Sequence, residues 1–294
     1  MRRKVIQLSK QTLVVSLPAK WARKYGIKKG DEIEMSEQPG FISLSPTSTQ
    51  KVFKSKEISA PEAGVLLPRL IVRLYEDGYD EIKITNFEAE TPQRVKKALI
   101  ELIGFETVEQ RSNYCILRDV AGQIKDEFPA LYRRLFLLVK GMLEDSVEAI
   151  RNWDYTALEH LEQRDIDVNR LAHYCMRYLA KNVISEHLEA MRKAVIVWSV
   201  ERIGDECKYL AAEIVKQRAV PEQEIVKQYE KAAKLFDACY RFVFDAKQET
   251  ATEASRIFEE IRRYGWKNIH LASIVDLSIQ LPALALPSVI QKTR

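Results

Sequence analysis

Two pairs of oxygen-bearing side chains, each pair spaced four residues apart, have the types and spacing needed for metal chemistry. They are Asp165 with Asn169, and Glu201 with Asp205. Residues at i and i+4 lie on one face of an α-helix, so each pair would present two oxygen ligands side by side. Ligand sets made only of oxygen favour hard cations such as magnesium, manganese, calcium or iron. A divalent metal or iron is therefore the cofactor that these four residues would hold.

The helical positions of these acids also predict their surroundings. At about 100° per residue, Glu201 and Asp205 lie opposite the apolar face of their helix, so we expect both to be accessible. Asp165 lies at the border of its own apolar face. The alternative is an ordinary solvated surface, on which Arg164 and Arg202 neutralise nearby acids without a metal.

The remaining polar and aromatic candidates predict packing, not catalysis. No histidine of the sequence stands in the Glu-x-x-His pattern of di-iron bundles, so we interpret all four as surface or core residues: His160, His173, His187 and His270. Trp198, Tyr174 and Tyr178 are expected to pack and not to stack on a ligand. Without a nucleophile–base arrangement, a glycine-rich phosphate loop or an H-E-x-x-H motif, we do not expect an enzyme. A metal-dependent hydrolase or oxidase is the least favoured alternative.

A dense group of cations opens the chain. Residues 1–30 hold nine basic side chains and no acid. Such cations neutralise phosphates and release counterions, so we predict contacts with double-stranded DNA. The contacts are assigned to seven residues: Arg2, Arg3, Lys4, Lys10, Lys20, Arg23 and Lys24. Lys28 and Lys29 precede a turn and are interpreted as solvated. The alternative is that the whole patch serves solubility or docks a protein partner.

The elements that carry these cations form a small β-rich domain, predicted over residues 1–47. Alternating apolar residues predict strands, and Ala19 to Tyr25 predicts a short helix that ends at Gly26. About 45 residues cannot bury much apolar surface alone, so we expect an intertwined homodimer. The stretch from Ser9 to Asp31, with its LP, GI and GD pairs, resembles the AbrB/SpoVT family of swapped-hairpin DNA-binding domains. The resemblance implies a dimer whose basic surface lies on DNA.

The rest of the chain predicts three further segments. Residues 48–120 are predicted to form a small α/β connector. A polar linker at 46–50 joins it to the head domain. Apolar residues at three- and four-residue spacing predict one three-helix bundle over 124–218 and a degenerate second bundle over 219–294, with a break at Pro221. The fold class is therefore multidomain, with a β-rich head, an α/β connector and a C-terminal all-α pair of bundles.

Two stretches of the first bundle, Gln163–Leu171 and Val200–Cys207, resemble the paired signature helices of the PhoU family of phosphate-uptake regulators. The sequence Glu201-Arg202-Ile203-Gly204-Asp205 follows the family pattern closely, whereas Asn169 stands where the family usually has Asp. The resemblance implies metal clusters on the bundle surface. It also implies a role in phosphate homeostasis, with transporter or signalling components as partners.

Together these features predict a DNA-binding transcriptional regulator of phosphate uptake, whose helical domain senses a metal, phosphate status or a partner. An antitoxin-like or scaffolding protein that uses the same head is the main alternative. We expect a cytoplasmic protein, because no apolar run approaches the ~18–20 uncharged residues of a membrane helix. The four cysteines form no C-x-x-C pair and are expected to be reduced and buried: Cys115, Cys175, Cys207 and Cys239.

Overall fold

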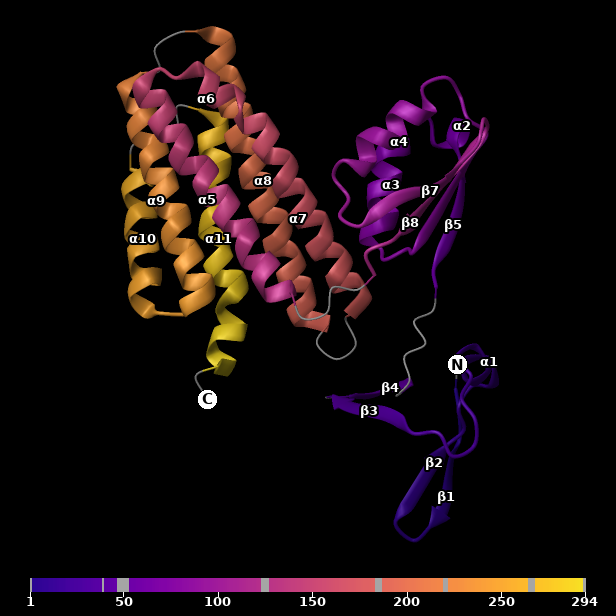
Figure 1. Cartoon of the computed structure of the whole chain (residues 1–294). Coiled ribbons are helices and arrows are strands. Elements are labelled where there is room, and N and C mark those ends of the chain that lie inside the picture. Colours follow the sequence, from indigo (N-terminus) through magenta and orange to yellow (C-terminus); the bar gives the residue numbers. More distant parts are fainter. Residues whose placement is uncertain are drawn as a thin grey trace. The chain divides into compact units, whose positions relative to one another are not determined.

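The computed structural model describes residues 2–38, 40–46, 53–122, 127–182, 187–218, 222–263 and 268–292. The chain divides into two compact units, Met1–Phe53 and Lys54–Arg294 (Figure 1). Residues 47–50 of the expected linker, and the expected helix break at Pro221, lie outside the described residues.

The first unit contains two separate antiparallel strand pairs and one short helix. Its elements are β1 (Val5–Ser9), β2 (Thr12–Val15), α1 (Ala19–Lys24), β3 (Ile33–Gln38) and β4 (Phe41–Pro46), with β1 paired to β2 and β3 to β4. Gly26 has a φ of +65°, as expected for the residue that leads the chain out of a helix. We name this unit the head.

The head has no core of its own. Within its described part no side chain is buried. Nine apolar residues of the four strands are instead more than 40% exposed: Val5, Ile6, Leu8, Leu13, Val15, Met35, Phe41, Ile42 and Leu44. A sheet with no covered face is not stable alone in water.

The second unit begins with an α/β module built on a four-stranded sheet. Its elements are β5 (Ser55–Ser59), α2 (Ala60–Ala63), η1 (Gly64–Leu66), α3 (Leu67–Glu76), β6 (Glu81–Thr85), α4 (Thr91–Leu99), β7 (Phe105–Gln110) and β8 (Tyr114–Asp119). The strand order is β5-β6-β8-β7, with β5 and β6 parallel and the other pairs antiparallel. Ile71 and Tyr75 of α3 and Val95 of α4 pack with Ile82 and Leu117 of the sheet.

Seven helices follow in the described part of the chain. They are α5 (Phe128–Asn152), α6 (Tyr155–Glu159), α7 (Leu161–Asn182), α8 (His187–Gln217), α9 (Gln223–Asp245), α10 (Gln248–Arg262) and α11 (Ile269–Lys292). α5 ends where Trp153 adopts a left-handed conformation. Asp154 then begins α6, because its side chain accepts a hydrogen bond from the N–H of Ala157 at 2.9 Å.

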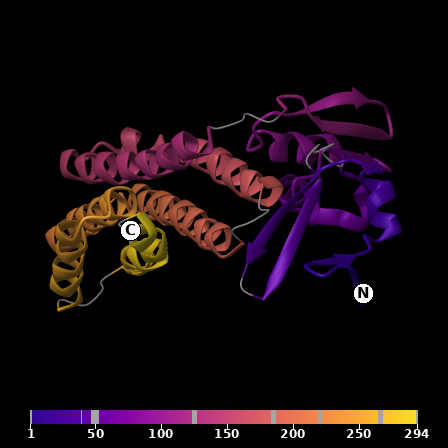
Figure 2. The ribbon, with the colours of Figure 1, turned by 90° about the horizontal axis from the view of Figure 1, so that it is seen from below.

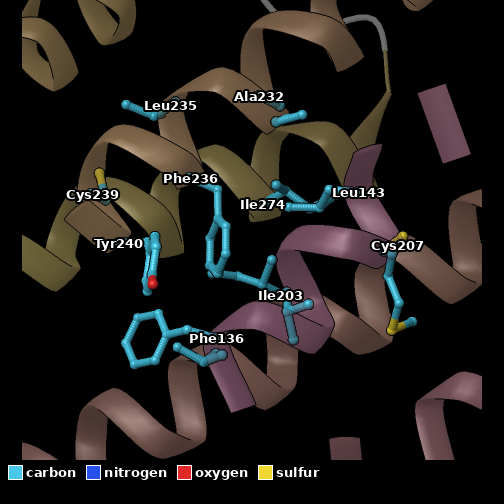
Figure 3. Close-up of a cluster of buried hydrophobic side chains, with 14 of the residues drawn as sticks. Phe136, Leu143, Ile203, Cys207, Ala232, Leu235, Phe236, Cys239, Tyr240 and Ile274 are labelled. Carbon is cyan, nitrogen blue, oxygen red and sulfur yellow. The ribbon is translucent and has the colours of Figure 1, made fainter. Parts of the chain in front are cut away.

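These helices share one core. α5, α7 and α8 pack together as one group, and α9 packs on α10 as a second. α11 connects the two groups because it packs on both α8 and α9 (Figure 2). The ring centre of Phe136 of α5 lies 6.1 Å from that of Phe236 and 5.9 Å from that of Tyr240, both on α9. Ile203 of α8 lies nearby (Figure 3). The four cysteines are free and buried, as the sequence predicts.

One apolar segment is long enough to contradict the expectation that the chain has no run of membrane-helix length. Ile269–Leu286 of α11 is long and apolar enough to cross a membrane by length and composition. The prediction missed it because it required uncharged residues, and Asp276 interrupts the run. Leu271, Ile274 and Val275 are nevertheless fully buried in the bundle core, as in the core helix of a bundle.

Candidate functional site

The structure brings the four predicted metal ligands into one cluster where α7 meets α8. Asp165 and Asn169 lie one turn apart on α7, with 3.5 Å between Asn169 Nδ2 and Asp165 Oδ2. Lys208 of α8 connects the two helices: its Nζ donates to Asp165 Oδ2 at 2.5 Å and to Asp205 Oδ1 at 2.6 Å. We name these residues, together with Glu201, the seam cluster.

The predicted accessibility of Asp205 is wrong, because this residue is only 9% exposed. Asp165, which the sequence places at the border of an apolar face, is 4% exposed. Periodicity along a single helix does not show that α7 and α8 pack on each other, or that α3 of the α/β module packs on α7. Asn169 Nδ2, for example, reaches Glu101 Oε1 just after α4, at 3.3 Å.

Basic side chains of the chain already pair with several of the oxygens that would bind a metal. Besides the Lys208 contacts, Arg202 donates to Asp205 Oδ2 at 3.0 Å and to Glu206 Oε1 at 2.6 Å. Arg164 pairs with Asp145. These are the arginine pairings of the metal-free alternative.

A metal ion does not fit the seam cluster as it is folded. Two buried oxygens, Asp165 Oδ1 and Asn169 Oδ1, have no hydrogen-bond partner and would suit a cation. Asp165 Oδ2 and Asp205 Oδ1, however, are already paired with the Lys208 ammonium. Among the described residues no three His, Cys, Asp or Glu side chains are grouped closely enough to bind a metal. Metal binding here stays a prediction, and it requires Lys208 to move away.

The charges of the seam cluster are strongly coupled. Burial and then the neighbouring Asp205 carboxylate raise the pKa of Glu201 to about 7. Burial alone would lower the pKa of Lys208, but its hydrogen bonds to Asp165 and Asp205 outweigh that effect and raise it. Lys208 therefore remains an ammonium ion at neutral pH.

A second set of charges, which the sequence analysis missed, joins α7 to the α/β module. His173, Arg177 and Lys181 follow one another at four-residue spacing and so share one face of α7. Arg177 donates to the carbonyls of Tyr75 and Tyr79, each at 2.7 Å. We name the three basic residues the α7 ladder.

The acids that face the α7 ladder all come from the α/β module. Arg177 donates to Asp119 Oδ2 at 2.7 Å, and Lys181 Nζ donates to Asp80 Oδ1 at 2.5 Å. His173 Nδ1 lies 2.9 Å from Glu76 Oε1. Burial by itself lowers the pKa of His173, but the carboxylates of Glu101 and Glu76 outweigh it and raise the pKa to about 9. The module is thus held to the bundle by charge pairs.

A cavity of about 930 Å³ lies beside the seam cluster, between α3 of the module and α8 of the bundle. Its lining includes Arg69, Lys97, Glu201, Lys208 and Trp198. Trp198 is 55% exposed, which contradicts the expectation that it packs. Tyr174 is buried and Tyr178 stacks on Phe128 at 4.7 Å, so those two residues pack as predicted.

The seven basic residues predicted to contact DNA all lie in the head, and all are exposed: Arg2, Arg3, Lys4, Lys10, Lys20, Arg23 and Lys24. Three of them belong to the short helix α1. Lys28 and Lys29 are exposed as well. The head therefore presents cations to solvent together with bare apolar strand faces.

A cationic β-rich head, an α/β module and an all-helical domain define the chain as a multidomain fusion. Family models match two of these parts. Residues 132–214 match the PhoU domain, and residues 6–51 match the antidote-toxin recognition MazE, bacterial antitoxin. The chain is therefore a MazE/AbrB-type domain fused to a PhoU domain. The PhoU match ends within α8, before α9 begins. No curated protein matches the chain.

Proposed function

We propose that the protein is a cytoplasmic, DNA-binding transcriptional regulator of phosphate homeostasis. The observation that carries this proposal is the head, where the first thirty residues hold nine cations and no acid, and where no described side chain of the strands is buried. Cations of this density suit a polyanion, and counterion release would supply much of the affinity. Lysine-rich contacts favour phosphates and DNA shape over the reading of base edges.

The bare strand faces support a homodimer of heads. Nine apolar side chains cannot all remain in water, and an intertwined partner would cover them without adding new elements. Two basic surfaces on one dimer would contact a longer stretch of DNA than one. The matched PhoU domain supports the link to phosphate, through sensing of phosphate status or of a transporter or signalling partner.

Two measurements on the full-length chain test the proposal. Sedimentation should give a dimer, and fluorescence anisotropy should show binding to duplex DNA in dilute buffer. Genome-wide mapping of binding sites in phosphate-starved and phosphate-replete cells should then place the protein near phosphate genes. A monomer that ignores duplex DNA would refute the regulator, and sites unrelated to phosphate genes would refute the phosphate assignment.

A second candidate function is that of an antitoxin. It is favoured by the match of residues 6–51 to a MazE antitoxin model. In that case the chain should neutralise a toxin encoded beside it. Co-expression with the neighbouring gene product should restore growth, and the head should co-purify with that product. Lack of any such rescue would leave the regulator as the better proposal.

A further inference from the structure

α8 exposes a stripe of four large apolar side chains in its N-terminal half. Leu188 is 67% exposed, Met191 is 64%, Val195 is 46% and Trp198 is 55%. Their spacings of three, four and three residues place them on one face of the helix. A contiguous apolar stripe of this kind on a water-exposed helix indicates an interface. We name these four residues the α8 stripe.

The α8 stripe is additional to the bundle core. The core face of α8 is made by residues that are 3% exposed or less, among them Ile196, Val200 and Ile203. α5, α7 and α11 pack on α8 within the bundle. The exposure of the stripe shows that no described element of the second unit covers it.

The spacing of the stripe reads the same in both directions, so the stripe is complementary to a second copy of itself. Two copies of α8 that cross antiparallel about a two-fold axis bring Leu188 opposite the partner's Trp198. The same register brings Met191 opposite the partner's Val195. Each stripe then covers the other, as an isologous interface requires.

The charge nearest the axis is compatible with this register. Lys193 lies midway along the stripe in sequence, but at about 100° per residue it points away from the apolar face. Its ammonium pairs with Glu189 Oε1 of the preceding turn at 2.5 Å. The Lys193 ammonium is therefore not enclosed where the helices would meet, whereas Arg192 lies about 80° from the centre of the stripe, at its edge.

The stripe is too small to hold two free chains together. Four partly exposed side chains offer roughly 400 Å² per copy, taking about 100 Å² for each. A stable dimer between free proteins buries about 800 Å² per partner. The contact therefore needs a tether, and the head dimer of the proposed function would supply one by raising the local concentration of the second copy.

We propose that the α8 stripe is a second, two-fold contact between the copies of this chain, formed once the heads have dimerised. The contact rests on the proposed head dimer. It holds the two helical domains against each other and so restricts the spacing of the two basic heads. Trp198 also lines the cavity beside the seam cluster, so the contact and the cavity share a residue.

Site-directed cross-linking of the full-length chain tests this contact. The native cysteines of the described chain are buried, so an introduced surface cysteine is the reactive one. Met191→Cys should cross-link between copies with a short bis-maleimide several times more than Lys234→Cys, an exposed control on α9. Adding Val195→Glu to Met191→Cys should reduce the cross-linking to the control level, because the register places residue 195 opposite residue 191.

Sedimentation of the same samples separates the possible failures. A dimer that cross-links no better at residue 191 than at residue 234 keeps the head dimer and overturns the α8 contact, leaving the stripe to a different protein. A monomer overturns both the head dimer and the contact. A dimer with strong cross-linking that Val195→Glu does not weaken would overturn the antiparallel register.

Discussion

Arg177 is 4% exposed, yet it satisfies two backbone carbonyls and a carboxylate of a different module. Its guanidinium also lies 4.7 Å from the ring centre of Tyr75. A buried cation in this position is stable only while each of its partners is present. Removing it leaves the two carbonyls and Asp119 without their shared donor.

We expect Arg177→Met to lower the free energy of unfolding by about 3–5 kcal/mol, the usual cost of breaking a buried ion pair. Urea unfolding followed by helical circular dichroism measures the change. Arg170→Met is the control, because Arg170 lies on the same helix and is exposed. A loss no larger than that of the control would show that the ladder does not hold the module.

His173 makes the same junction dependent on pH. Its pKa is about 9 in the folded protein, against 6.5 for a free histidine. A raised pKa contributes stability that is complete below pH 6.5 and disappears as the pH rises through 9. The contribution is about 3–4 kcal/mol at most, from about 1.4 kcal/mol per pKa unit.

The variant His173→Gln should therefore lose stability at pH 6 and match the native chain at pH 9.5. Thermal unfolding at both pH values measures this difference. His160→Gln, at an exposed position of the first bundle, should show no such pH-dependent gap. An equal loss for His173→Gln at both pH values would mean that the imidazole acts through packing and not through its charge.

Lys208 decides whether the seam cluster can bind a metal. Lys208→Gln removes the ammonium that Asp165 and Asp205 share, so the two carboxylates should then attract a divalent cation. We expect calorimetry with Mn²⁺ to show binding at least about tenfold tighter than in the native chain, equivalent to about 1.4 kcal/mol. Adding Glu201→Gln and Asp205→Asn should abolish the gain. Equal affinity with and without Lys208 would contradict this account.

Among the elements, α8 contains a glycine whose role is packing. A Cβ on Gly204 would lie 3.3 Å from Val168 Cγ1 and 3.5 Å from Val139 Cγ2, so α8 approaches α7 and α5 closely there. This explains in physical terms why the Glu-Arg-Ile-Gly-Asp stretch has glycine at its fourth position. A larger side chain would push three helices apart.

We expect Gly204→Leu to cost about 1–3 kcal/mol through overpacking. Gly141→Leu on α5 is the matched control. A Cβ at Gly141 would meet only the end of the Arg164 side chain, which can move, and the change should cost less than about 1 kcal/mol. Urea unfolding compares the two variants. Equal losses would mean that the approach of the helices at Gly204 is not tight.

The elements themselves could be predicted well from the sequence, because periodicity reports which face of a helix or strand is apolar. The helices expected in the second bundle, over 219–294, occur as α9, α10 and α11. The surroundings of Asp165 and Asp205 could not be predicted in this way. Their burial depends on which helices meet and on a lysine seven residues beyond Glu201, and periodicity along one helix carries neither fact.

For the whole molecule, the separation of charge and apolar surface matters most. The head has exposed cations and no core, whereas the second unit has extensive cores and internal ion pairs. Composition could predict that the head does not bury its own strands, because so short a segment cannot enclose a core. It could not predict the pairing of the α7 ladder with its acids, which lie between 58 and 101 residues away along the chain.

The distribution of head cations gives the last prediction, which concerns salt. If Lys20 and Arg23 contact phosphates, the dimer loses four contacts in the variant Lys20→Gln, Arg23→Gln. The slope of log affinity against log salt should then become less negative by about 3–4, since each phosphate contact contributes about 0.9. The variant Lys28→Gln, Lys29→Gln removes the same charge from residues predicted to be solvated, so its slope should hardly change. Anisotropy titrations with duplex DNA over a range of salt concentrations compare the two. Equal slopes in both variants would mean that net charge alone, and not a defined surface around α1, attracts the DNA.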